Sequence, residues 1–246
     1  MKRLLRLASQ LLLLSFFLFI GHWGYARLLE DPSFRVREVE IEGCCKVSQE
    51  AILSLIMIEG MPNLFSLRLG EIARRLERHP WIDHLAIRKV FPNKVRIQIE
   101  ERRPVAILQL EELYYIDAKG VIFSPARDGD GYNFPFLTGL TRQVFERDPE
   151  ASRDLIMKAL DFLRVAEREK VPPLEEISEI HMSRSFGMDC YTRAHGLEVK
   201  MGRDSFGEKL RRLSIVWSDL QKRGLSAMSI DCSDLDRMVI KKSREG

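Results

Sequence analysis

The 246-residue sequence has few cysteines, and none stands in a spacing that binds metal. Its four cysteines are Cys44, Cys45, Cys190 and Cys232, and the absence of any C-x-x-C pair excludes the usual zinc-site spacings. The adjacent Cys44 and Cys45 suit neither a disulfide with each other nor tetrahedral ligation. Cys190 and Cys232 fall in predicted strands and would be able to pair if those strands are neighbours. We favour the alternative, four small buried or free thiols.

The sequence also lacks the motifs that carry common catalytic chemistry. Its five histidines show no H-E-x-x-H or other paired-ligand spacing, and there is no G-x-S-x-G and no glycine-rich phosphate loop with its lysine. The segment 128–131, Asp-Gly-Asp-Gly, begins like a calcium loop, but Tyr132 occupies the next ligand position. We therefore expect no catalytic residue, no metal and no cofactor, and we interpret this segment as a solvated turn.

Charge of one sign is not concentrated anywhere in the chain. Lys and Arg number 39 against 36 Asp and Glu, which gives a formal net charge of +3. Basic and acidic residues are intermixed, whereas nucleic-acid binders show a dense basic stripe. The composition therefore argues against a nucleic-acid partner, and it is ordinary for a globular chain.

One long apolar run lies at the amino terminus. No charged residue occurs from Leu7 to Tyr25, and as a helix this stretch spans about 28 Å, enough to cross a membrane. We predict a basic cytoplasmic tail (1–6), a transmembrane helix (7–26) and a linker (27–33), with the remainder exported according to the positive-inside rule. The alternative is a cleaved signal peptide, since the small residues Gly24 and Ala26 flank a possible cleavage site.

The segment 34–103 predicts a first exported domain with the element order strand, helix, helix, strand, strand. Residues 38–42 alternate polar and apolar, Ser48 is suited to cap one helix and Ser66 a second, and residues 95–100 alternate again. Two helices on one face of a three-stranded sheet make a compact unit. Its predicted core consists of Val39, Ile41, Ile52, Ile56, Leu76, Ile97 and Ile99.

The segment 104–246 predicts a second domain of strands and helices. Asp148 is expected to cap a helix that has Pro149 in its first turn, and Ser205 with Glu208 to form a capping box for the last helix. Between them, residues 188–192 and 197–201 read as a hairpin that turns at His195. Met228, Ile230 and Cys232 alternate with Ser229 and Asp231 in a strand, and a final strand runs from Met238 to Lys241.

The order of these elements resembles the POTRA domain, and several segments resemble the FtsQ/DivIB family of bacterial cell-division proteins. They are HPWI (79–82), RKVFPN (88–93), IQIEERRPVA (97–106), YIDAKGVIF (115–123) and PFLTG (135–139). The resemblance extends from the basic tail to residue 241. It implies an α+β fold: one transmembrane helix, a POTRA domain of β-α-α-β-β order, and a mixed β-sheet domain with helices on one side.

The resemblance also implies a function. Such a protein is a non-catalytic, single-pass scaffold of the inner membrane at the division site, with its bulk in the periplasm. Its partners are other bitopic division proteins, FtsB-like and FtsL-like, which pair with a sheet edge during septum formation. The family's contact positions map to Arg184, Ser229, Ile230 and Asp231, beside the terminal strand Met238, Val239, Ile240 and Lys241. Ser229 departs from the aromatic residue that relatives often carry there.

Two other functions compete with this one. A POTRA-bearing component of an outer-membrane transport or assembly system normally carries several POTRA units and a long carboxy-terminal barrel, and neither is seen in this sequence. A secreted periplasmic enzyme with a cleaved signal lacks the catalytic constellation that it needs. The terminal strand read by itself is equally well explained as an ordinary edge that its lysines protect.

The charge asymmetry around the apolar run generates a prediction about topology. Because Lys2, Arg3 and Arg6 precede the run, the anchor should be uncleaved, with its amino terminus in the cytoplasm. Alkaline phosphatase fused after Gly246 should be active, and the membrane-bound protein should retain its original amino terminus. Amino-terminal sequencing that finds a mature chain starting at Arg27 would contradict the anchor.

Overall fold

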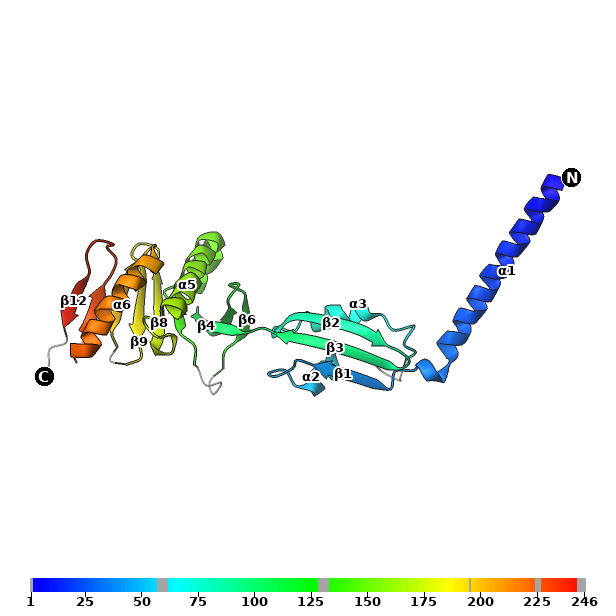
Figure 1. Ribbon diagram of the computed structural model, residues 1–246, viewed down its shortest axis with the longest axis horizontal. Coiled ribbons are helices and arrows are strands. Elements are labelled where there is room, and N and C mark those ends of the chain that lie inside the picture. Colours follow the sequence, from blue (N-terminus) through cyan, green and yellow to red (C-terminus); the bar gives the residue numbers. More distant parts are fainter. Residues whose placement is uncertain (1, 57–61, 128–132, 195, 224–226, 243–246) are drawn as a thin grey trace. The chain divides into compact units, whose positions relative to one another are not determined.

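The computed structural model describes residues 2–56, 62–127, 133–194, 196–223 and 227–242, and the chain divides into two compact units, Met1–Arg102 and Arg103–Gly246. Figure 1 shows the elements of each unit in order along the chain. The calcium-like segment 128–131 with Tyr132 and the turn residue His195 lie outside the described residues.

The first unit begins with the long helix α1 (Lys2–Glu30). Its apolar side chains, Leu11 to Ile20 among them, are exposed, and the stretch Ser9–Glu30 is long and apolar enough to cross a membrane. Such exposure in water is costly, whereas in lipid it is not. At the end of the helix, the Asn63 side-chain amide donates to the carbonyl oxygens of Leu28 (2.8 Å) and Leu29 (2.9 Å), satisfying acceptors that have no partner within the helix.

A three-stranded sheet with two helices completes the first unit. After the 3₁₀ turn η1 (Pro32–Phe34) come β1 (Glu38–Glu42), α2 (Gln49–Ile56), α3 (Leu69–Leu76), β2 (Ile82–Val90) and β3 (Lys94–Glu101). The strand order is β1-β3-β2, with β3 in the middle, parallel to β1 and antiparallel to β2. This is the order of elements that the sequence predicts.

The predicted core of this unit is largely confirmed. Five of its members are buried, and they are Ile52, Ile56, Leu76, Ile97 and Ile99. Val39 and Ile41 are only half-buried, because β1 is an edge strand with a neighbour on one side. Ser48 caps α2 through a bond from the Ala51 amide at 3.2 Å.

The predicted Ser66 cap of the second helix is wrong. The N-cap position of α3 is Arg68, which makes no side-chain capping bond. The Ser66 hydroxyl instead donates to the Asn63 carbonyl oxygen at 2.8 Å. A capping side chain must lie within hydrogen-bond reach of the first free amides, and Ser66 is two residues too early.

The second unit contains a nine-stranded mixed sheet in the order β12-β11-β10-β9-β8-β7-β4-β5-β6. The strands are β4 (Pro104–Gln109), β5 (Leu113–Asp117), β6 (Ile122–Pro125), β7 (Phe136–Thr138), β8 (Ile177–Ser183), β9 (Gly187–Thr192), β10 (Glu198–Gly202), β11 (Ala227–Asp231) and β12 (Val239–Lys242). The pairs β4–β7, β7–β8 and β10–β11 are parallel. The sequence pattern did not predict β8, which lies at the centre of the sheet.

The helices of this unit are α4 (Arg142–Arg147), α5 (Pro149–Glu169) and α6 (Phe206–Arg223), with the 3₁₀ turn η2 (Leu174–Glu176). The Asp148 cap of α5 is confirmed by its bond from the Ala151 amide. The predicted capping box of α6 is not formed. Ser205 has a φ of 58°, outside the extended conformation of an N-cap, and Glu208 pairs with Arg212 at 3.3 Å.

The apolar faces of α5 and α6 pack on one face of the sheet, and the two helices contact each other. Inward strand residues such as Ile180, Cys190, Val199 and Ile230 share one core with them. The alternation in β11 fails at one position, because a register irregularity between Ala227 and Ser229 leaves Met228 exposed.

The cysteines are free thiols, as the favoured interpretation expects. Cys190 on β9 and Cys232 after β11 are both buried, but β10 separates their strands, so the neighbouring arrangement that a disulfide requires is absent. Burial raises the pKa of both thiols to about 12. They are therefore protonated at neutral pH and behave as small core residues.

The burial of β3 generates a prediction about stability. Ile97→Ala should lower the free energy of unfolding of the first unit by about 2–4 kcal/mol, because a fully buried side chain is removed. Glu100→Ala, an exposed change on the other face of the same strand, should change it by about 0.5 kcal/mol or less. Urea unfolding of the detergent-solubilised chain, followed by pulse proteolysis, measures both. A loss well below about 1 kcal/mol for Ile97→Ala would mean that the inward face of β3 is misassigned.

Candidate functional site

The last strand, β12, forms one edge of the nine-stranded sheet. It pairs on one side only, antiparallel to β11, with Asp231 opposite Val239, Ile230 opposite Ile240, and Ser229 opposite Lys241. The strand runs from Val239 to Lys242, so the predicted start at Met238 is one residue too early. Within the described part of the chain, its outer row of backbone N–H and C=O groups has no neighbouring strand, which makes it a template for another chain.

The side chains of β12 protect this edge only in part. All four are exposed, and Val239 and Ile240 retain 48% and 39% of their full exposure. Lys241 and Lys242 add charge, which discourages unspecific pairing between sheets. The two lysines therefore disfavour pairing with a second copy of this strand, whereas Val239 and Ile240 leave apolar surface uncovered at the edge.

Two rows of side chains, polar in all but the final Val239, cross the face of the sheet that α5 and α6 do not cover, and both end on β12; they are called the polar rows below. They are defined by cross-strand register, which places paired residues on the same face. The first row is Glu179, Tyr191, Glu198, Ser229 and Lys241, and the second is His181, Asp189, Lys200, Asp231 and Val239. A strand added at β12 would continue both rows, so its side chains would lie beside Lys241 and Val239.

The carboxyl of Asp231 keeps its charge beside this edge. Burial alone raises its pKa, but the hydroxyl and backbone N–H of Ser233 donate to it, and with the ammonium groups of Lys200 and Lys209 they bring the pKa below its usual value. Lys209 itself is buried, and its Nζ donates to the Met201 carbonyl oxygen at 2.9 Å. In the next strands, burial and the Glu198 carboxylate raise the pKa of Asp189.

The structure brings together some of the sequence-predicted site residues. Ser229 and Asp231 are half-exposed on the uncovered face and lie next to Lys241 and Val239 on β12. Ile230 is fully buried, so its side chain is not available to a partner and instead supports Ile240 from the core side. Met238 is partly buried against the same core.

Arg184 lies apart from this group, in the turn between β8 and β9. Two strands separate β8 from β11, which corresponds to roughly 14 Å across the sheet. Its guanidinium pairs with the Asp148 carboxylate at 3.0 Å and reaches the Ser152 hydroxyl at 3.4 Å. These bonds hold Arg184 in place and leave it partly exposed.

Sequence reasoning missed the neighbour of Arg184, Phe186, which is 81% exposed. The turn that presents it is braced: the Phe186 amide donates to the Ser183 hydroxyl, and Arg203 donates to the Ser185 carbonyl oxygen. Gly187 follows with a φ of +91°, and its α-carbon faces the Gly202 backbone too closely for a Cβ. A single aromatic residue directly before a glycine was the available signal, but sequence alone does not show its exposure.

A cavity of about 290 Å³ lies beside this turn, with Leu155 and Met188 on its apolar side and Lys158, Arg184 and Arg203 among its lining residues. The Lys158 ammonium is paired with Asp154 at 2.9 Å. The cavity lining carries the cations Lys158, Arg184 and Arg203 against the carboxylate of Asp154, so its net positive charge favours an acidic contact over a basic one. Among the described residues, no group of three or more His, Cys, Asp or Glu side chains is placed to hold a metal ion.

Two family models match the chain, one on each compact unit. The POTRA domain of FtsQ type matches residues 34–102, and the C-terminal domain of the cell division protein FtsQ/DivIB matches residues 106–235. The second match ends before β12.

Relatives of similar length agree with this assignment. Cell division protein FtsQ of Geobacter sp. (strain M21) is 31% identical over 223 residues, covering 90% of this chain and 81% of the relative. Cell division protein FtsQ of Syntrophotalea carbinolica is 32% identical over 214 residues, covering 87% and 76%. On these matches, which span both units, the chain belongs to the FtsQ family of cell-division proteins.

Proposed function

We propose that this chain is a non-catalytic scaffold of the divisome that recruits bitopic division proteins, FtsB-like or FtsL-like, by adding a partner strand at β12. The FtsQ family is a family of membrane-anchored cell-division proteins, which supports the divisome role. The observation that carries the mechanism is the outer edge of β12, which pairs with no other strand among the described residues and is exposed at all four of its own residues.

Strand addition explains how a short partner segment would be held and selected. Main-chain hydrogen bonds along the edge would supply affinity, each contributing about 0.5–1.5 kcal/mol net. Selectivity would come from the two polar rows, which set the side chain that fits at each partner position. An acidic residue suits the position beside Lys241, and apolar residues suit those beside Val239 and Ile240.

A second contact at the β8–β9 turn would extend the interface beyond the added strand. The ion pair with Asp148 already restrains the Arg184 side chain, which is partly exposed. Arg184 would therefore bind an acidic side chain of the partner with only a small further loss of side-chain entropy. Phe186 offers an exposed aromatic face beside it. Ser229, where relatives often carry an aromatic ring, buries less apolar surface and weakens the contact at that point.

In this proposal α1 anchors the protein in the inner membrane, with the basic tail in the cytoplasm and both units in the periplasm. The alternative role in outer-membrane transport is not favoured, because both family matches are to cell-division domains. A fluorescent fusion discriminates the two roles: a divisome scaffold gathers at midcell in dividing cells, whereas a transport component is spread around the envelope.

The edge mechanism predicts the effect of a proline in β12. Val239→Pro removes a backbone donor and disturbs regular pairing, so it should weaken binding of an FtsB-like protein at least about tenfold, a loss of about 1.4 kcal/mol. Val239→Ala shortens the same side chain but keeps the donor, and it should lose much less. Binding is measured by pull-down from detergent-solubilised membranes.

The controls separate binding from folding. Each variant should first show the near-ultraviolet circular dichroism and thermal unfolding of the parent chain. Glu100→Ala, an exposed change on β3 of the first unit, should bind like the parent because it lies outside the unit that contains β12 and the Arg184 turn. If folded Val239→Pro binds as tightly as the parent chain, strand addition at this edge is excluded, and the first unit becomes the next surface to test.

A further inference from the structure

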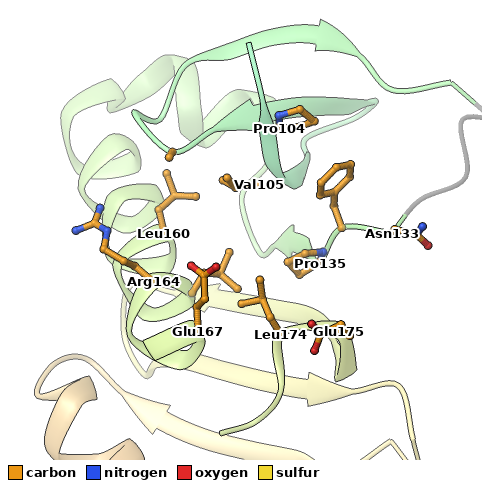
Figure 2. A pocket seen from close by; sticks show the side chains of 12 residues that line it. Pro104, Val105, Asn133, Pro135, Leu160, Arg164, Glu167, Leu174 and Glu175 are labelled. Atoms are coloured by element: carbon orange, nitrogen blue, oxygen red, sulfur yellow. The ribbon is translucent and has the colours of Figure 1, made fainter. Parts of the chain in front are cut away.

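A cavity of about 300 Å³ lies in the second unit, far along the sheet from β12. Figure 2 shows it between the start of β4, the carboxy-terminal half of α5, and the segments around Pro135 and Leu174. We propose that this cavity binds a Lys or Arg side chain presented by an extended segment of a partner protein. The proposal does not depend on strand addition at β12.

The walls of the cavity are mainly apolar and are assembled from separate parts of the chain. Pro104 and Val105 form one side, Leu160 and Leu163 of α5 a second, and Leu174 with Phe134 and Pro135 the rest. Phe134 is fixed by an edge-to-face contact with Tyr115, with ring centroids 6.2 Å apart. These walls suit an aliphatic stem, and the Phe134 ring also attracts a cation.

The rim of the cavity carries negative charge. Glu167 on α5 and Glu175 in η2 both line it and are exposed, and in the described part of the chain neither forms an ion pair. The cationic lining residue, Arg164, is already paired with Asp161 at 3.3 Å. In Figure 2 its guanidinium points away from the centre of the cavity, whereas Glu167 points toward it.

Apolar walls below two carboxylates match one class of side chain. A Lys or Arg places three or four methylene groups in the cavity and its charge at the rim, where it remains hydrated. An acidic side chain would be repelled by the carboxylates of Glu167 and Glu175. A purely apolar side chain would form no favourable charge interaction with either carboxylate. The size of the cavity fits one long side chain, so the rest of the partner segment would lie across the rim.

The test uses methyl-labelled full-length protein in detergent micelles and three acetylated, amidated pentapeptides of sequence Gly-Ser-X-Ser-Gly. X is arginine, its uncharged isostere citrulline, or glutamate. The arginine peptide should shift the methyl signals of Val105, Leu160 and Leu174 in a saturable manner. The citrulline peptide should bind roughly three- to tenfold more weakly, the range expected for one exposed ion pair and its hydrogen bonds. The glutamate peptide should give no saturable shift.

Variants test whether Glu167 and Glu175 cause the preference for the arginine peptide over the citrulline peptide. Glu167→Gln combined with Glu175→Gln should reduce the affinity for the arginine peptide to that for the citrulline peptide. Glu150→Gln, an exposed carboxylate in the first turn of the same helix, should leave it unchanged. Equal binding of the arginine and citrulline peptides to the parent, shifts confined to methyl groups elsewhere, or no saturation at high millimolar concentration would each overturn the proposal.

Discussion

The backbone of a β-sheet must pair its N–H and C=O groups, and an open sheet always leaves two edges where this requirement is not met. In the second unit, the order of the elements along the chain decides which strand has unpaired backbone groups at the edge. The helix α6 connects the parallel strands β10 and β11, and β12 then returns through the loop 232–238 onto the outside of β11. The proposed partner site depends on this position of β12, because both polar rows of side chains then end at the open edge of the sheet.

The two faces of this sheet carry different kinds of side chain. The face under α5 and α6 is a continuous apolar core, in which the thiols of Cys190 and Cys232 are buried as neutral groups. The uncovered face carries Glu179, Glu198, Lys200 and Asp231 in register. Since each strand alternates between the faces, a partner strand at β12 would meet the core rim on one side and fixed charges on the other.

The surfaces proposed for partners differ in charge within one unit. Lys241, Lys242 and the Arg184 turn are cationic, whereas the rim of the cavity beside α5 has the carboxylates of Glu167 and Glu175. Opposite charges direct each partner segment to its own surface and penalise the wrong pairing. A scaffold that holds more than one partner without catalysis gains from such separation.

The sequence by itself determined the local features of this protein. The apolar run of α1, the alternation of β3, the Ser48 and Asp148 caps and the inward positions of Ile97, Val199 and Ile230 all follow from patterns within a few residues. The order β-α-α-β-β of the first unit was predicted from the same patterns, whereas the mixed sheet of the second was predicted from the family resemblance alone.

Only the tertiary structure decided which strands are neighbours. It placed Arg184 two strands away from β11, separated Cys190 from Cys232, exposed Met228 at a register irregularity, and assembled the cavity from β4, α5 and the segments near Phe134 and Leu174. Local periodicity sets which face a side chain takes, because it depends on residues two to four positions apart. Strand pairing joins residues tens of positions apart, and no local pattern encodes it.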